Sequence, residues 1–232
     1  MVAVVAREEL RPLVERAAVE LADASALEIL TWADEQFGSG WCVTSSMADA
    51  VVPHLASRVR PGVDVLFLDT GYHFAETIGT RDAVAATLPV TVRTLAPKRT
   101  VAEQDASFGP RLYERNPDQC CALRKVMPLR EGLMSYVAWA SGLRRDEVHT
   151  RADAKVVEWD DRRSMVKVNP IAAWTQDDVD TYIAEHGVLV NPLLFDGFGS
   201  VGCAPCTRRT AHGEDARAGR WAGLAKTECG LH

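Results

Sequence analysis

Two short cysteine motifs in this chain have the residue types and the spacing of a metal centre. Cys120 and Cys121 are neighbours in the sequence, and Cys203 and Cys206 form a CxxC motif. A disulfide between sequence neighbours is strained, because bridged cysteines need a specific separation and torsion. We therefore expect the neighbouring cysteines to act together with the CxxC motif rather than with each other.

Four thiolates are the number needed for an iron–sulfur cluster or for a structural zinc site. Zinc sites built from four cysteines normally use two CxxC-type motifs. Adjacent residues on a helix point about 100° apart, which suits two corners of a cubane better than one small tetrahedron. The pattern therefore favours a cluster over zinc, with a thioredoxin-type redox CxxC motif and a buried, inert cysteine pair as the alternatives without a metal.

The remaining two cysteines lie in opposite surroundings. Cys42 is inside an apolar segment, where a free cysteine usually packs as a small core residue. Cys229 belongs to the terminal motif Lys226-Thr227-Glu228-Cys229-Gly230-Leu231-His232, which has no apolar pattern around it. A lysine and a histidine flank Cys229 at three residues on either side, and such surroundings favour a reactive thiolate. Cys229 is thus either a reactive thiol or a solvated terminal one.

Cations accompany these cysteines in an otherwise acidic protein with a net charge of −6. They follow the cysteine pair, follow a predicted strand, or precede the terminal motif: Arg124, Lys125, Arg144, Arg145, Arg151, Arg208, Arg209, Arg217 and Arg220. Guanidinium groups bind phosphate and sulfate well, so this clustering predicts a local site for a small anion. The net charge argues against nucleic acid as a partner.

The predicted elements around these motifs are those of a mostly parallel, doubly wound α/β sheet. Strands are expected at 41–44, 63–68, 90–95 and 136–140, and helices at 48–56, 74–88 and 119–134. Short strands that alternate with helices indicate βαβ units, and such sheets bind ligands beyond the carboxyl ends of their strands. Two of these ends carry polar residues, namely Thr44, Ser45, Ser46 and Asp69.

We expect the 232 residues to form a single domain in three parts. Helices occupy 1–38, with a capping box at Ser25 and Glu28. An α/β core spans 39–190 and ends with a hairpin (156–159 and 165–168) and a helix (175–186), which we expect Thr175 and Asp178 to cap. An irregular segment, 191–232, carries the CxxC motif and the terminal cysteine.

The cellular setting is expected to be the cytoplasm. No apolar run approaches the roughly 20 residues of a membrane span, so no membrane association is expected. The N-terminus lacks the features of a secretory signal. Cysteines in such a protein serve metals or chemistry rather than disulfides.

Four motifs, taken in order, resemble the sulfonucleotide reductases, and among them the assimilatory adenylyl sulfate (APS) reductases. They are Phe67-Leu68-Asp69-Thr70-Gly71-Tyr72-His73-Phe74, Cys120-Cys121-x-x-Arg124-Lys125, Gly202-Cys203-x-Pro205-Cys206-Thr207 and the terminal motif. The resemblance runs from about residue 40 to the C-terminus. It implies a fold of the adenine-nucleotide alpha-hydrolase-like type with an irregular catalytic tail, and a reaction in which APS and two thiols give sulfite and AMP.

The resemblance also implies roles for single residues. The nucleophile falls on Cys229, which would form an S-sulfocysteine that thioredoxin or a similar dithiol resolves. The ligands of a 4Fe-4S cluster fall on Cys120, Cys121, Cys203 and Cys206. Substrate binding is expected from the strand-end residues Thr44, Ser45, Ser46 and Asp69, together with Lys125, Arg144, Arg145, Arg217, Arg220 and His232. One departure is the loop 44–50, which has no glycine and only one acid where many relatives have glycine and two acids.

Three other functions are alternatives. Reduction of the 3'-phosphorylated substrate (PAPS) is the nearest, but relatives dedicated to PAPS typically lack the four cluster cysteines. An ATP-pyrophosphatase-like (PP-loop) tRNA thiolase shares the fold, although the acidic charge and the complete terminal motif argue against it. A non-catalytic iron–sulfur sensor would need the cluster but not Cys229.

Overall fold

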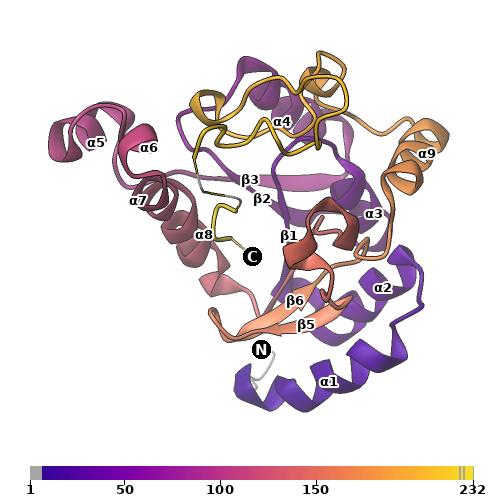
Figure 1. Cartoon of the computed structure of the whole chain (residues 1–232). Helices are drawn as coiled ribbons and strands as arrows, with labels where there is room; N and C mark the ends of the chain where they lie inside the picture. The colour runs from indigo at the N-terminus through magenta and orange to yellow at the C-terminus, as the bar shows by residue number, and fades with distance from the viewer. Residues whose placement is uncertain (1–6, 225, 227, 232) are drawn as a thin grey trace.

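The computed structural model describes residues 7–224, 226 and 228–231. A six-stranded sheet with the order β3-β2-β1-β4-β6-β5 lies at the centre (Figure 1). Its strands are β1 (Trp41–Ser45), β2 (Val63–Leu68), β3 (Val90–Leu95), β4 (Ala138–Ser141), β5 (Val157–Asp160) and β6 (Met165–Val168).

The sheet is parallel except at one edge. β1 pairs in parallel with β2 and with β4, and β4 pairs in parallel with β6. β5 pairs antiparallel with β6, so the predicted hairpin forms the antiparallel edge. The prediction of a doubly wound, mostly parallel α/β fold is confirmed. Strand order reverses at β1, which lies between β2 and β4, and ligands of such sheets bind beside this reversal.

Helices flank the sheet on both faces. They are α1 (Arg11–Glu20), α2 (Ala26–Phe37), α3 (Val51–Val59), α4 (Ala75–Thr87), α5 (Val101–Phe108), α6 (Leu112–Arg115), α7 (Pro117–Cys121), α8 (Met127–Gly132) and α9 (Gln176–His186). The predicted caps are confirmed. The Ser25 and Thr175 side chains each accept a hydrogen bond from the amide of the third helical residue, and their own backbone amides each donate to the carboxylate of that same residue. In the part of the chain that the structure describes, no helix has the length and apolar character needed to cross a bilayer.

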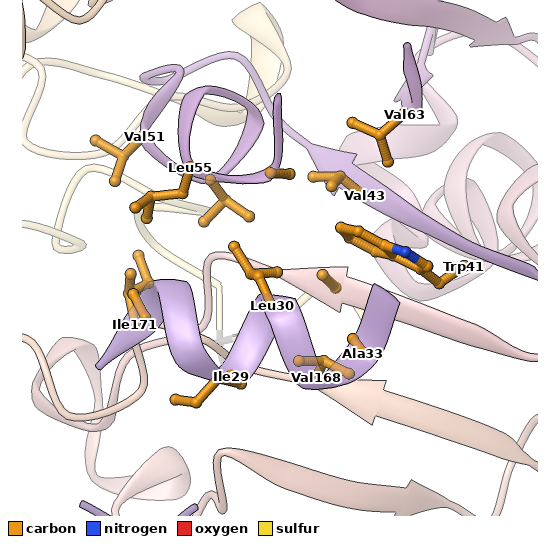
Figure 2. Close-up of a cluster of buried hydrophobic side chains, with 14 of the residues drawn as sticks. Ile29, Leu30, Ala33, Trp41, Val43, Val51, Leu55, Val63, Val168 and Ile171 are labelled. Carbon is orange, nitrogen blue, oxygen red and sulfur yellow. The ribbon is translucent and has the colours of Figure 1, made fainter. Parts of the chain in front are cut away.

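The larger core lies on the face of the sheet that α2 and α3 cover (Figure 2). Ile29, Leu30 and Ala33 form one apolar stripe of α2, because residues three and four apart share a helix face, and all three are buried. They pack with Val43 of β1 and Leu55 of α3. This core fixes the strands whose carboxyl ends carry the site.

A second, smaller core lies on the opposite face of the sheet. Side chains alternate between the faces of a strand, so Cys42 belongs to this second core while Trp41 and Val43 belong to the first. The second core consists of Cys42, Leu66, Leu129, Leu133, Tyr136, Trp139 and Met165, with Leu68, Leu95 and Leu231 packed against it. Cys42 is fully buried there, which confirms its prediction as a core residue.

The helix expected over 119–134 is broken, and this expectation was wrong. The structure has α7, then a π-helical turn (η3, Ala122–Val126), then α8 and a 3-10 turn at Leu133–Ser135. Pro128 has no N–H to donate to the carbonyl four residues earlier, and the wider turn lies directly before it. The short helices α5 and α6 were not predicted.

The helix expected from residue 48 begins instead at Val51. Asp49 forms an isolated antiparallel bridge with Val190. The Ala50 amide donates to the Leu189 carbonyl (2.9 Å), and the Asn191 amide donates to the Ala48 carbonyl (2.9 Å). A distant segment thus takes the backbone groups that would have extended the helix.

Candidate active site

The four cysteines of the two motifs line one cavity. Cys120 and Cys121 end α7, Cys203 precedes the short 3-10 turn η8 (Ala204–Cys206), and Cys206 is the last residue of that turn. Tyr72, Tyr113, Arg124, Lys125 and Trp221 line the same cavity. Folding therefore brings together the two motifs that the sequence separates by about eighty positions.

Backbone contacts hold the CxxC motif against the rest of the site. The Ala204 amide donates to the Tyr72 carbonyl at 2.7 Å, and the Trp221 amide donates to the Cys206 carbonyl at 2.9 Å. The Thr70 hydroxyl lies 3.3 Å from the Cys203 sulfur. The end of β2 and the segment before the tail thus fix the motif from two sides.

The thiols share a buried environment that opposes their ionisation. Burial raises the pKa of Cys120 to about 11, and the neighbouring Cys121 and Cys203 add to the rise. Burial also raises the pKa of Cys206 to about 12, again with help from Cys203. Several thiolates cannot coexist in such a place without a compensating positive charge, and this arrangement suits a bound metal group.

The arrangement of the thiols fits a cluster better than a single ion. Among the described residues, two buried donors near the cavity, Tyr72 Oη and Arg220 Nε, have no hydrogen-bond partner, and the Gln104 side chain hydrogen-bonds the Cys120 thiol. Sulfur atoms of a cluster are acceptors for such donors, so the residues present fit a group larger than one ion.

Gln104 and Arg124 stabilise the cysteine helix, which is α7 with Cys120 and Cys121 at its end. Arg124 Nη1 donates to Gln104 Oε1 at 3.1 Å, and Arg124 Nε donates to the Thr70 carbonyl. The Arg124 guanidinium also lies 5.1 Å from the centre of the Tyr72 ring. Both side chains are buried, so they set the position of α7 relative to β2.

Lys125 lies between the cavity and the terminal cysteine. Burial by itself lowers the pKa of Lys125, but the thiols of Cys203 and Cys229 outweigh it and raise the pKa. The same lysine lowers the pKa of Cys121 against the rise that burial causes. One ammonium group thus faces both kinds of cysteine that the sequence singled out.

Arg217 and Arg220 approach the site from the segment before the tail. Arg220 Nη1 donates to Ser200 Oγ and to the Val201 carbonyl, each at 3.2 Å, and its guanidinium lies 4.6 Å from the centre of the Trp221 ring. Burial and the neighbouring Arg217 lower the pKa of Arg220. A buried cation next to a second cation is a natural anion site.

The tail is folded back into the molecule rather than extended from it (Figure 1). The Glu228 carboxylate is 2.7 Å from Arg151 Nη2 and 3.4 Å from Arg217 Nη2. Lys226 forms an ion pair with Asp118 at the start of α7. Cys229 is therefore held at the site, between the arginines and the cysteine helix.

The predicted residues at the strand ends are engaged in local backbone contacts. Thr44 Oγ1 donates to the Ala140 carbonyl at 3.2 Å, Ser45 Oγ accepts from the Met47 amide at 3.1 Å, and Asp69 Oδ1 accepts from the Gly71 amide at 2.9 Å. Ser46 is exposed. Met47 adopts a left-handed conformation with φ of 59° in the loop that lacks glycine. Contacts of these residues with substrate stay predictions.

Three arginines follow β4, and one of them, Arg151, contacts the tail. Arg144 Nη2 donates to Gln176 Oε1 at 2.8 Å, and Arg145 Nε donates to the Ala154 carbonyl at 2.7 Å. Arg151, which was noted only as part of the cation cluster, reaches Glu228. The substrate roles of Arg144 and Arg145 stay predictions, and His232 lies outside the described residues.

Sequence reasoning missed Arg151, Gln104 and Glu228 as parts of the site. Arg151 carried a signal, since it belongs to the same run of cations. Glu228 stands next to Cys229 in the terminal motif. Gln104 carried none, because its helix was not predicted and its neighbours in the site are distant in sequence.

A family model described as the phosphoadenosine phosphosulfate reductase domain matches residues 41–209. This chain belongs to that family. The resemblance to the sulfonucleotide reductases is thereby confirmed. Adenosine 5'-phosphosulfate reductase of Streptomyces coelicolor is 70% identical over 225 residues, which are 97% of this chain and 95% of the relative. The enzyme of the same name from Mycolicibacterium smegmatis is 59% identical over 224 residues, with the same two shares covered.

Solved structures support the fold. The phosphoadenylyl-sulfate (PAPS) reductase of Candida auris, solved as a phosphate complex, superimposes with a TM-score of 0.72 at 27% identity and covers 84% of this chain and 96% of its own. FMN adenylyltransferase of Candida glabrata matches with a TM-score of 0.56 at 13% identity, over 89% of this chain and 75% of its own, and shows the fold alone. The adenine-nucleotide alpha-hydrolase-like prediction is confirmed.

Proposed function

We propose that this chain reduces adenylyl sulfate to sulfite and AMP, as a step in the assimilation of sulfate towards cysteine. The observation that carries the proposal is the placement of Cys229, which lies beside Lys125 and the cysteine-lined cavity in a chain 70% identical to a named APS reductase. A thiol, an ammonium group and two arginines at one place are the groups that transfer of a sulfonate to sulfur requires.

In the first step the Cys229 thiolate attacks the sulfur of the bound sulfate. A sulfur–sulfur bond forms as the bond from sulfur to the AMP phosphate oxygen breaks, AMP leaves, and Cys229 becomes an S-sulfocysteine. Lys125, Arg217 and Arg220 neutralise the negative charge that accumulates on the sulfate and phosphate oxygens. Such fixed charges need little reorganisation during the reaction.

In the second step a dithiol such as thioredoxin releases the product. One thiolate of the dithiol attacks Cys229 Sγ and expels sulfite, and the second thiolate then frees Cys229 and leaves an oxidised dithiol. The two electrons come from the dithiol, and the transferred sulfur leaves as sulfite. Cys229 is only half-buried, so a modest opening of the tail exposes it to such a partner.

We assign Cys120, Cys121, Cys203 and Cys206 as the ligands of a 4Fe-4S cluster. When bound, the cluster supplies positive charge that compensates the buried thiolates and orders the site around Lys125. Tyr72 lines the cavity that would hold the cluster, and Gln104 would support one of its ligands through a hydrogen bond to Cys120. The cysteines among the described residues are all free, and we place the reaction in the cytoplasm, where thiols stay reduced.

The substrate assignment is tested by comparing APS with PAPS at equal concentration. Sulfite release is expected to be much faster with APS, and equal or reversed rates would overturn the assignment in favour of PAPS, the substrate of the Candida auris relative. Without reductant, the enzyme is expected to release one AMP and to gain the mass of SO₃ on its C-terminal peptide. Cys229→Ser should bind AMP but form no adduct, and an adduct on Cys42 would show that the nucleophile is misplaced.

A further inference from the structure

The tail reaches past Cys229 and covers part of the sheet. Leu231 packs against the second core, the one formed by Cys42, Leu66, Leu129, Leu133, Tyr136, Trp139 and Met165. Gly230, between Cys229 and Leu231, has φ of 79°, and a Cβ added there would lie 3.8 Å from Val126 Cγ2. The chain therefore turns sharply after the cysteine and places an apolar side chain on an apolar surface.

Arg163 meets this part of the tail from the β5–β6 hairpin. Arg163 Nη2 donates to the Leu231 carbonyl at 3.0 Å. The contact joins two residues that are 68 positions apart in the sequence. This hydrogen bond adds to the apolar contact of the Leu231 side chain. Leu231 is therefore held through both its backbone and its side chain.

The Arg163 side chain is held in place for this contact. Its Nη1 donates to Asp160 Oδ2 at 2.7 Å, and the side chains of this pair are only 8% and 7% exposed. Its guanidinium lies 5.3 Å from the centre of the Trp139 ring. A buried ion pair with its hydrogen bonds satisfied keeps a long side chain in one rotamer, so the donor to Leu231 is positioned by the hairpin itself.

We propose that Arg163 is a positioning residue, which docks the tail at Leu231 and thereby holds the Cys229 thiol at the site. The proposal rests on the assignment of Cys229 as the nucleophile. Glu228 anchors the tail on one side of Cys229 through Arg151 and Arg217, and Leu231 anchors it on the other side through Arg163. When the contact between Arg163 and Leu231 is lost, the end of the chain moves away from the site while Arg151 and Arg217 stay in place.

The docking is measured without APS, as the rate at which iodoacetamide alkylates Cys229. The rate is read by mass spectrometry of the C-terminal peptide. Loss of a hydrogen bond to a charged group is expected to raise this rate roughly tenfold in Arg163→Met. Because that change leaves Asp160 unpaired, the double variant Asp160→Asn/Arg163→Met is measured beside it. Leu231→Ala acts from the tail and leaves the hairpin intact, and it is expected to raise the rate as well.

The control is Asp161→Asn on the same hairpin, which removes an exposed ion pair with Arg11 and is expected to leave alkylation unchanged. Arg163→Lys, which keeps a donor, is expected to fall between wild type and Arg163→Met. AMP affinity is expected to stay unchanged in all variants, whereas formation of the S-sulfocysteine slows by about the same factor as alkylation accelerates.

An alkylation rate that stays at the wild-type level in both the double variant and Leu231→Ala would overturn the proposal. If these variants alkylate faster while the wild type forms no adduct with APS, the docking contact stands and the proposed function fails. If adduct formation slows without faster alkylation, Arg163 acts on something other than the tail, and the proposal is wrong.

Discussion

Arg151 and Glu228 form a short ion pair that joins the segment after β4 to the C-terminal tail, with Arg151 Nη2 at 2.7 Å from Glu228 Oε1. The arginine side chain is 9% exposed and that of the glutamate 24%. Arg151 also pairs with Glu147, and Glu228 also faces Arg217. The residue next to Cys229 is thus tied to Arg151 and to Arg217, and we propose that Arg217 binds the substrate anion.

Glu228→Gln is expected to slow formation of the S-sulfocysteine adduct. The amide keeps an acceptor for Arg151 but loses its charge, and hydrogen bonds to charged groups contribute about 1.5–3 kcal/mol. Because the pair is partly exposed, we expect the lower end, roughly tenfold in single-turnover rate. The matched control is Glu20→Gln, an exposed glutamate at the end of α1. An unchanged rate would show that Glu228 does not position the thiol.

Cys203→Ser is expected to remove the metal group. The prepared wild-type protein should be brown and contain iron and sulfide, and the variant should lose both the visible absorption and the iron, because one corner of the cluster loses its ligand. Cys42→Ala, a change in the second core, is expected to keep the colour. Stoichiometric zinc without iron in the wild type would contradict the cluster and favour a four-cysteine zinc site.

Gly202→Ala is expected to weaken binding of APS. A Cβ at this position would overlap with the Arg220 guanidinium and displace a proposed anion-binding group, with a loss of roughly tenfold in affinity for one charge-assisted contact. Gly79 of α4 has nothing within 4 Å of an added Cβ. Gly79→Ala is therefore the control, expected to keep affinity and to stabilise the helix by about 0.5–1 kcal/mol. Equal affinities of the two variants would remove Arg220 from the binding site.

Asp49→Asn is expected to stabilise the protein at neutral pH but not in acid. Burial raises the pKa of Asp49 above its ordinary value of 3.8. The hydrogen bond from the Val51 amide and the charge of Arg144 lower the pKa but do not cancel the effect of burial. Between the two pKa values the folded protein holds a proton that the unfolded chain has released, so the free energy of unfolding falls as the pH rises through this interval. Asparagine keeps the oxygen that accepts from the Val51 amide (2.9 Å) but cannot ionise.

Thermal unfolding at a series of pH values checks this prediction. The gain of Asp49→Asn over wild type should be present at pH 7 and should vanish near and below the ordinary pKa of 3.8. Asp23→Asn, at an exposed position after α1, should show no such pH dependence. A gain of the same size at low pH would mean that ionisation of Asp49 is not its cause.

Local patterns in the sequence determined many of the strands and helices of this protein and the identity of its motifs. Strands β2 and β3 have the predicted bounds, and the caps at Ser25 and Thr175 are those expected, because a cap depends on residues three positions apart. The four motifs, which are Phe67–Phe74, the cysteine pair with Arg124 and Lys125, the CxxC motif and the terminal motif, indicated the family, since their residue types and order are readable without a fold.

Tertiary structure decided what the motifs contact. α3 begins later than predicted because Leu189–Asn191 bind the backbone of Ala48–Ala50. No local sequence pattern indicates a partner some 140 positions away. The contact of Arg151 with Glu228 depends on tertiary structure for the same reason, because a run of cations does not say which side chain reaches a distant segment. The Arg163–Leu231 contact likewise depends on the hairpin and the tail meeting over the second core. Such pairings follow from packing of the whole chain, which a sequence pattern of period two or 3.6 does not encode.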